Sequence, residues 1–273
     1  MNILEAIKKG NKILKKEGIK SYKLDSEILM SHVTQKSRVD IILNLNTNLS
    51  NKDIILFENL IKQRSKRKPI AYLIGKKEFW KYEFNITKDV LIPRPDTEII
   101  IDQTLKLTKN KSGLKILDVG IGSGCILLSI LKESKSFYGT WIDICKKTLD
   151  ICKANVKKLD LINRIKLFKS DIDNFNYGKY DLIVSNPPYI KKFDLKYLEK
   201  DVYDYEPISA LDGGLDGLSK VTKVIYNSSK LIKNGGILIL EIAFDQTDKV
   251  KKILRKNGYY IKDVIKDLIS WPL

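Results

Sequence analysis

The sequence contains few of the residues that build disulfide frameworks and metal sites. Its 273 residues include three cysteines, Cys125, Cys145 and Cys152, without a Cys-x-x-Cys pair, and a single histidine, His32. A lone histidine in a helical segment is usually structural, so we expect no bound metal. The shortage of cysteine argues against a secreted disulfide scaffold and favours a reduced, cytoplasmic protein.

Long apolar runs are also missing. No stretch approaches membrane-spanning length, and the first residues lack the basic and then apolar segments of a signal peptide. We therefore expect no membrane partner. Apolar residues still make up 43% of the chain, which is enough for the core of one large domain or two smaller ones.

Acidic residues are outnumbered by basic ones. The 50 lysines and arginines exceed the 33 aspartates and glutamates, which gives a formal net charge of +17. This charge suits an anionic partner such as RNA or a ribosome-associated protein. The basic residues are spread along the chain, and lysine, isoleucine and asparagine are abundant throughout. The positive charge is therefore at least as well explained by overall composition as by a specific nucleic-acid surface. Direct nucleic-acid binding is therefore not expected from charge alone, although it stays open.

Hydrophobic periodicity separates a helical N-terminal part from the rest. Apolar residues between positions 2 and 66 recur at helical spacing, and Ser50 with Asp53 marks a helix start. Residues 78–86 are aromatic and roughly alternating, which predicts a β-hairpin. A stiff Pro-Arg-Pro-Asp-Thr-Glu stretch follows at 93–98, in which Asp96 or Thr97 is expected to cap a helix.

From Lys115 onward, strands and helices alternate. The pattern predicts strands at residues 116–119, 138–142, 165–168, 180–184, 236–241 and 259–265, and helices at 125–133, 146–156, 218–232 and 246–256. Such alternation is typical of an α/β fold with a doubly wound parallel sheet. We expect a helical domain at residues 1–75, a β-hairpin linker at 76–97 and the α/β domain at 98–273.

Two strand ends in the α/β domain carry ligand-binding features. The turn Gly120-Ile121-Gly122-Ser123-Gly124 joins a strand to a helix, and its glycines let backbone approach a ligand closely. A dinucleotide site would use similar glycines. However, Asp118 would repel a pyrophosphate, whereas it suits the cationic amino-acid tail of S-adenosylmethionine. Asp143, at the end of the next strand, is placed to accept both hydroxyls of a ribose. S-adenosylmethionine is therefore the predicted cofactor.

The stretch Ser185-Asn186-Pro187-Pro188-Tyr189 carries the predicted chemistry. Its prolines end the strand ladder, so the turn presents a carboxamide, a backbone carbonyl and a phenol at the carboxyl edge of the sheet. Planar nitrogens, in amides or exocyclic amines, are poor nucleophiles. The Asn186 oxygen and the Pro187 carbonyl can accept both N–H groups and aim the lone pair at a methyl group. Tyr189 would lie against the planar group. We predict Asn186, Pro187 and Tyr189 as catalytic residues.

Asn-Pro-Pro-Tyr is shared with adenine methyltransferases, so it indicates the kind of nitrogen rather than the substrate. Three more stretches narrow the choice, namely Glu78-Phe79-Trp80, residues 91–98 and the glycine-rich pattern at 206–217. With them, the sequence resembles the peptide chain release factor N5-glutamine methyltransferases over nearly its whole length. The resemblance implies a Rossmann-like class I methyltransferase sheet with a small N-terminal helical domain, which we expect to dock the substrate. We expect a monomer.

The resemblance also implies an activity and a set of site residues. The family transfers a methyl group from S-adenosylmethionine to the side-chain amide nitrogen, N5, of the glutamine in the Gly-Gly-Gln motif of class 1 release factors. By position, Asp118, residues 120–124, Asp143 and Asn186 would bind the cofactor, and Asp171 with Ile172 would border its adenine. Residues 186–189 would hold the glutamine.

The sequence departs from the family pattern at three places. Ile172 replaces an aromatic residue of some members, Ala243 stands where glycine is frequent, and the usual final antiparallel strand is missing after Leu268. Two alternatives stay open. An N6-adenine methyltransferase acting on DNA or RNA would suit the charge, but it usually carries a recognition domain. A non-catalytic binding protein could keep the fold, although the intact Asp118 and Asn186 argue against it.

Overall fold

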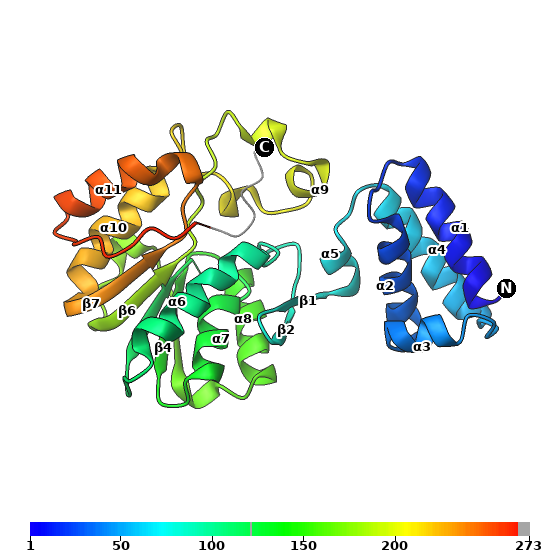
Figure 1. Cartoon of the computed structure of the whole chain (residues 1–273), viewed down its shortest axis with the longest axis horizontal. Helices are drawn as coiled ribbons and strands as arrows, with labels where there is room; N and C mark the ends of the chain where they lie inside the picture. The colour runs from blue at the N-terminus through cyan, green and yellow to red at the C-terminus, as the bar shows by residue number, and fades with distance from the viewer. Residues whose placement is uncertain (121, 267–273) are drawn as a thin grey trace. The chain divides into compact units, whose positions relative to one another are not determined.

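The computed structural model describes residues 1–120 and 122–266, and the chain divides into two compact units (Figure 1). The helical unit comprises residues 1–76 together with residues 199–205. The sheet unit comprises residues 77–198 and the chain from Glu206 onward. None of the helices in the described part of the chain has the length and apolarity needed to cross a membrane.

The helical unit follows the predicted helical periodicity. Its helices are α1 (Ile3–Lys16), α2 (Tyr22–Thr34), α3 (Arg38–Leu43), α4 (Asn51–Ser65), α5 (Ile70–Ile74) and the short α9 (Lys200–Tyr203). The predicted start of α4 is confirmed, because the Ser50 hydroxyl accepts a hydrogen bond from the backbone N–H of Asp53 at 3.1 Å. Apolar side chains of these helices, including Ile3, Leu29 and Phe57, form one buried cluster.

Residues 199–205 join the helical unit through a buried ion cluster that no sequence pattern predicted. Arg64 is buried, and its Nε lies 2.7 Å from Asp25 while its Nη1 lies 2.6 Å from Asp201. The Tyr205 hydroxyl also donates to the Lys66 carbonyl at 2.7 Å. A buried guanidinium needs such partners, since an unpaired charge in the interior is very costly. The ion cluster therefore fixes a segment distant in sequence onto α4.

The predicted hairpin is present at the start of the sheet unit. Strands β1 (Lys76–Phe79) and β2 (Tyr82–Asn85) form a two-stranded sheet, and the rings of Phe79 and Phe84 pack edge to face with centroids 6.2 Å apart. Trp80 turns between the strands with a φ of 58°. Its backbone N–H donates to the Glu98 carboxylate at 2.7 Å, which ties the turn to the start of α6 (Glu98–Thr108).

The rest of the sheet unit is the predicted alternating α/β fold. Within the described residues its parallel strands run in the order β5-β4-β3-β6-β7. Residues Ile116 to Val119 are all buried, as expected for a strand covered by helices on both faces. The strands are β3 (Lys115–Val119), β4 (Tyr138–Asp143), β5 (Ile165–Lys169), β6 (Tyr180–Ser185) and β7 (Ile232–Leu240), and the helices are α7 (Cys125–Glu133), α8 (Lys146–Lys158), α10 (Ser219–Leu231) and α11 (Thr247–Lys256).

The strand predicted at residues 259–265 is wrong. Residues 259–266 have no regular secondary structure, and the Tyr259 N–H bonds back to the Leu254 carbonyl at 3.0 Å, closing the end of α11. Alternating apolar residues indicate a strand only when another strand is there to pair with, and periodicity does not reveal the neighbour. The expected loss of a last strand concerns residues after Leu268, which lie outside the described residues.

Candidate active site

The carboxyl ends of neighbouring parallel strands bring the predicted site residues to one edge of the sheet. Asp118 stands opposite Trp141 of β4 and Val184 of β6 in the register. The buried Ser185 hydroxyl donates to the Val119 carbonyl at 2.7 Å, which locks the ends of β3 and β6 together. The glycine turn, Asp143 and Asn186 all follow these strand ends, where open α/β folds bind ligands.

The first two glycines of the turn border open space, whereas the third is packed tightly against β4. Gly120, Gly122 and Gly124 have φ values of 82°, 54° and 83°, a backbone region that favours glycine. A Cβ at Gly120 or Gly122 would meet nothing within 4 Å, whereas one at Gly124 would lie 2.7 Å from the Trp141 ring. The first two glycines therefore border a possible ligand space, and the third lets α7 approach β4. Ser123 is buried with an unpaired hydroxyl, and Ile121 lies outside the described residues.

Asp118 is a buried carboxyl group without a hydrogen-bond partner. It is 1% exposed, and neither of its carboxylate oxygens has a partner among the described residues. Burial, with a smaller contribution from the negative charge of Asp143, raises the pKa of Asp118 to about 8. Two unpaired acceptor oxygens at a strand end suit a cationic donor, and the ammonium group of S-adenosylmethionine is one.

The remaining predicted cofactor residues have partners of their own. Asp143 ends β4, and its Oδ1 accepts the backbone N–H of Cys145 at 2.8 Å. Asp171 caps a 3-10 turn by accepting the N–H of Asp173 at 3.1 Å. Ile172 is buried in the cluster that covers one face of the sheet. Their roles in binding ribose and adenine stay predictions.

The protein holds the amide nitrogen of Asn186, whereas the predicted task of this residue uses the amide oxygen. Its Nδ2 donates to the Thr97 hydroxyl at 3.2 Å, which leaves the Oδ1 atom as the acceptor for a substrate. The predicted position of Thr97 directly before α6 is confirmed, but the side-chain cap is wrong, because Thr97 adopts helical backbone angles and its side chain makes no cap hydrogen bond. Its hydroxyl is used by Asn186 instead. Pro187 is buried beside it, and Pro188 is half-buried.

Tyr189 is anchored by a glutamate from the next strand. Its hydroxyl donates to Oε1 of Glu241 at 3.2 Å. Burial and then the nearby Glu241 charge raise the pKa of Tyr189, so the phenol stays protonated at neutral pH. Burial also raises the pKa of Glu241, and the nearby polar side chains of Thr97, Tyr189 and Asn186 oppose that rise.

The glycine-rich loop at 206–217 supports the Asn-Pro-Pro-Tyr turn through its backbone. The Ile190 N–H donates to the Leu211 carbonyl at 3.1 Å, and the Gly213 N–H donates to the Ile190 carbonyl at 2.8 Å. A Cβ at Gly213 would lie 2.8 Å from the Tyr189 Cα, so only glycine permits this approach. At the start of the loop, the Glu206 carboxylate pairs with Arg94 and accepts the Ile92 N–H at 3.2 Å. The two family-like stretches, 91–98 and 206–217, are thus joined to each other.

Three residues of this arrangement were missed at the level of sequence. Gln246 is 2% exposed, and its Nε2 donates to the carbonyls of Tyr189 at 2.9 Å and of Gly217 at 3.1 Å. No pattern around Gln246 marks it. Glu241 had a usable signal, since it is an acidic residue directly after the apolar strand β7, and Asp143 is likewise an acidic residue at the end of β4. Thr97 was noticed only as a cap.

Comparisons with known proteins agree with this geometry. The chain matches the models of the PrmC N-terminal domain over residues 5–75 and of the Methyltransferase small domain over residues 97–199. It is 37% identical over 270 residues to the Release factor glutamine methyltransferase of Clostridium acetobutylicum, with 98% of this chain and 95% of that protein covered. The chain belongs to the release factor glutamine methyltransferase family.

Two further similarities concern other members of the wider group. The chain is 36% identical to the Bifunctional methyltransferase of Rickettsia typhi, where the match covers 98% of this chain but 56% of that protein. The chain therefore spans little more than half of that relative. The solved hMettl16 catalytic domain is 19% identical with a TM-score of 0.53, and the match covers 64% of this chain and 66% of that one. This likeness shows the shared Rossmann-like fold of class I methyltransferases.

Family membership makes the chain a methyltransferase that uses S-adenosylmethionine, and the described residues fit that cofactor. The unpaired oxygens of Asp118 suit its ammonium group, and Gly120 and Gly122 leave space where side chains would intrude. The arrangement also contains no cluster of three or more potential metal ligands within residues 1–120 and 122–266.

Proposed function

We propose that this protein methylates the side-chain amide nitrogen, N5, of the glutamine in the Gly-Gly-Gln motif of class 1 peptide chain release factors. The observation that carries the proposal is the Asn186 carboxamide, whose Nδ2 is occupied by Thr97 while Oδ1 stays available as an acceptor. Together with the Pro187 carbonyl, it offers two acceptors to the two N–H groups of a primary amide. The family to which the chain belongs supports glutamine as the amide.

The chemical task of the turn is orientation. An amide nitrogen is a weak nucleophile because its lone pair is delocalised into the carbonyl group. Hydrogen bonds to Asn186 Oδ1 and to the Pro187 carbonyl hold the NH₂ group so that its lone pair is directed at the methyl group. Bound S-adenosylmethionine supplies that methyl group from its sulfonium. The Tyr189 ring lies against the amide plane. After transfer the nitrogen is cationic and acidic, so it loses one proton to water and becomes the neutral N-methyl amide.

A tritium-transfer assay tests this proposal. The protein is incubated with labelled S-adenosylmethionine and with whole release factor, with DNA and RNA, or with neither. We expect label only on the release factor, and on the glutamine of its Gly-Gly-Gln motif. A release-factor variant with that glutamine replaced by alanine is the matched control and should stay unlabelled. Label on nucleic acid alone would establish the N6-adenine alternative, and no label with any acceptor would contradict an enzymatic role.

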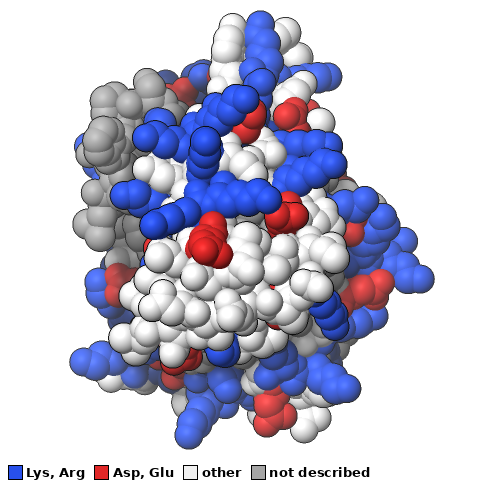
Figure 2. All heavy atoms as spheres, turned by 90° about the vertical axis from the view of Figure 1, so that its right-hand side faces the viewer, with Lys and Arg blue, Asp and Glu red and all other residues white. Residues whose placement is uncertain are grey.

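The proposal includes a second contact, made by the helical unit on the release factor away from the Gly-Gly-Gln motif. One glutamine side chain offers little surface for recognition among all cellular proteins, and a second contact raises its effective concentration at the site. The helical unit exposes apolar side chains on α3, of which Leu43 is 75% and Val39 65% exposed. Figure 2 shows a broad uncharged area below a band of lysine and arginine side chains. Apolar area bordered by charge is typical of a protein-binding surface.

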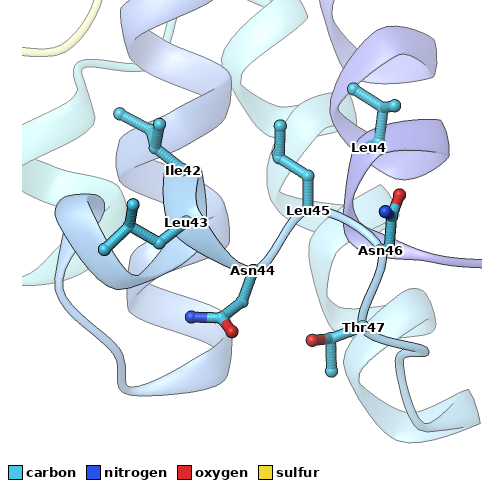
Figure 3. A pocket seen from close by; sticks show the side chains of 7 residues that line it. All are labelled: Leu4, Ile42, Leu43, Asn44, Leu45, Asn46 and Thr47. Carbon is cyan, nitrogen blue, oxygen red and sulfur yellow. The ribbon is translucent and has the colours of Figure 1, made fainter.

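A hollow at the end of α3 lies within this unit. It has a volume of about 600 Å³ and is lined by Leu4 and residues 42–47 (Figure 3). The backbone around it is fixed, because the Leu4 N–H donates to the Leu45 carbonyl and the Ile3 N–H to the Thr47 carbonyl, both at 3.0 Å. The hollow is lined by both apolar and polar side chains, so it suits a partner residue that offers an apolar part together with a hydrogen-bonding group. The excess of positive charge on the chain favours an acidic surrounding surface on that partner.

Substitution at the apolar patch tests the second contact. Leu43→Asp should raise the KM for whole release factor about tenfold or more, while activity on a short Gly-Gly-Gln peptide stays unchanged. Ile162→Asp is the matched control, because Ile162 is an apolar residue of the sheet unit that is 60% exposed. Equal losses on factor and peptide would contradict docking, as would an unchanged KM for the factor. We further propose that the enzyme acts in the cytoplasm, where release factors work, and that it acts as a monomer.

A further inference from the structure

The orientation of the Asn186 carboxamide decides whether the site can work. An asparagine side chain presents an acceptor at Oδ1 and a donor at Nδ2, and a rotation of 180° exchanges the two. A donor facing the substrate NH₂ would leave the N–H group assigned to Asn186 without its acceptor. The protein must therefore hold one of the two orientations before the substrate arrives, because preorganised polar groups are the source of the rate gain.

Thr97 supplies the first element of that control. Its side chain is 3% exposed, and its hydroxyl oxygen accepts the hydrogen bond from Asn186 Nδ2 at 3.2 Å. A hydroxyl that accepts one hydrogen bond still has its own hydrogen to donate. The carboxyl group of Glu241 is near enough for Thr97 to lower its pKa, and it accepts a hydrogen bond from Tyr189 at 3.2 Å, so it is the acceptor we assign to the Thr97 hydroxyl.

Glu241 supplies the second element, because its carboxyl group already accepts a hydrogen bond from the Tyr189 hydroxyl. Glu241 directly follows the last residue of β7. Its backbone N–H donates to the carbonyl of Ser185 at 3.1 Å, and this bond fixes Glu241 close to Asn186, the next residue along the chain from Ser185. Its Oε1 accepts from Tyr189, and its buried Oε2 has no hydrogen-bond partner among the described residues. This oxygen is therefore available to accept the hydrogen of the Thr97 hydroxyl.

We propose that Thr97 and Glu241 are positioning residues that set the direction of hydrogen bonding through Asn186 and Tyr189. Glu241 accepts from the Thr97 hydroxyl, the Thr97 oxygen accepts from Asn186 Nδ2, and Asn186 Oδ1 is left facing the substrate amide. Glu241 also accepts from Tyr189 and so fixes the ring that lies against that amide. The inference rests on the proposed function, because it takes an amide as the group that Asn186 receives.

Substitutions of Thr97 separate the hydrogen bond from the shape of the side chain. Thr97→Val keeps the volume and removes the hydroxyl, so kcat on release factor should fall about tenfold or more, while the Kd for S-adenosylmethionine stays within about twofold. Thr97→Ser keeps the hydroxyl and should restore most of the rate. Thr104→Val is the matched control, because Thr104 is a fully buried threonine within α6, the helix that follows Thr97, and its hydroxyl has no partner among the described residues. A Thr97→Val enzyme with normal kcat, or a Thr97→Ser enzyme as impaired as Thr97→Val, would overturn the assignment.

Glu241→Gln tests the carboxylate. The substitution keeps the size but adds an NH₂ group that faces the Thr97 and Tyr189 hydroxyls, so the direction of the hydrogen bonds becomes mixed. We expect a kcat loss of about tenfold or more, again with little change in the Kd for S-adenosylmethionine. A normal kcat, or equal losses in kcat and cofactor affinity, would remove Glu241 from the positioning role.

A measurement without substrate keeps this inference separate from the proposed function. The side-chain NH₂ resonances of Asn186, assigned by their absence in Asn186→Ala, report directly on the hydrogen bond from Nδ2. They should shift in Thr97→Val and in Glu241→Gln but not in Thr104→Val. Such shifts in a protein that fails to methylate release factor would support the positioning pair and contradict the function. Unchanged resonances in both variants would overturn the pair whatever the activity.

Discussion

The side-chain amide of Gln246 donates a hydrogen bond to the backbone carbonyl of Tyr189 at 2.9 Å. The same nitrogen donates to the carbonyl of Gly217 at 3.1 Å, so one buried residue joins the turn of the candidate active site to the end of the glycine-rich loop. Both carbonyls would otherwise be buried acceptors, which cost free energy when left unpaired. The position of Tyr189 therefore depends on backbone contacts as well as on its hydroxyl group.

This closeness makes Gly217 sensitive to the smallest substitution. A Cβ at Gly217 would lie 2.4 Å from the Tyr189 carbonyl oxygen, and its φ is 75°. Gly217→Ala should lower kcat about tenfold or more and reduce thermal stability, because the turn must shift to make room. Gly235→Ala is the matched control, since Gly235 has a φ of 71° but nothing within 4 Å of its Cβ position. It should lose some stability and keep kcat; equal kcat losses in the two variants would contradict the steric argument.

The buried Asp118 should make folding stability depend on pH. Its pKa is raised from the ordinary value of 3.8 to about 8, so between these values the folded protein holds a proton that the unfolded chain has released. The folded state is therefore favoured at the acidic end of this range, and stability falls as the pH rises toward about 8. Asp118→Asn cannot ionise and should gain in Tm relative to the wild type between pH 6 and pH 8. An equal Tm difference at both pH values would show that Asp118 is already ionised when folded.

The same carboxyl group should link cofactor binding to proton release. An ammonium group favours the ionised carboxylate, so below pH 8 binding must displace the Asp118 proton. Calorimetry should show affinity for S-adenosylmethionine rising between pH 6 and pH 7.5 in the wild type. Asp118→Asn should bind more weakly by about 1–3 kcal/mol and lose most of this pH dependence. Unchanged affinity in that variant would remove Asp118 from the cofactor site.

Asn186 is expected to act in catalysis more than in binding. Asn186→Ala removes the acceptor offered to the substrate amide, so turnover should fall by about 10² or more. The Kd for S-adenosylmethionine should change much less. Single-turnover assays with whole release factor measure the chemical step directly. A near-normal rate in Asn186→Ala would contradict the positioning mechanism altogether.

The buried ion cluster of the helical unit should be costly to break. Arg64→Ala leaves the carboxylates of Asp25 and Asp201 without their shared partner, and we expect a loss of about 3–5 kcal/mol in the free energy of unfolding. Lys9→Ala is the matched control, because Lys9 and Glu58 form an ion pair at 2.6 Å with both side chains exposed. Removing that pair should cost at most about 1 kcal/mol in urea unfolding experiments. Similar losses in the two variants would mean that solvent reaches Arg64.

The parts of the fold that could be predicted are those that depend on local pattern. The helix at 125–133 was predicted with its observed ends, because a glycine turn directly precedes it and most of its residues are apolar. The strand at 259–265 was wrong because pairing depends on a neighbour elsewhere in the chain. Thr97 was expected to cap a helix, since the pattern could not show that Asn186, 89 residues away, uses its hydroxyl. Gln246 and Glu241 were missed for the same reason, because their partners are set by tertiary structure.

The membership of residues 199–205 in the helical unit affects how this protein can vary between lineages. In the sequence, Arg64 and Asp25 belong to the first 76 residues, whereas Asp201 belongs to the short stretch 199–205 that interrupts the sheet unit. A recombination event that replaced the first 76 residues with those of a distant relative would separate Arg64 from the Asp201 it was selected with. Exchange of this unit is therefore expected to succeed only when both stretches are inherited together, and substitutions at positions 64 and 201 should be correlated among relatives.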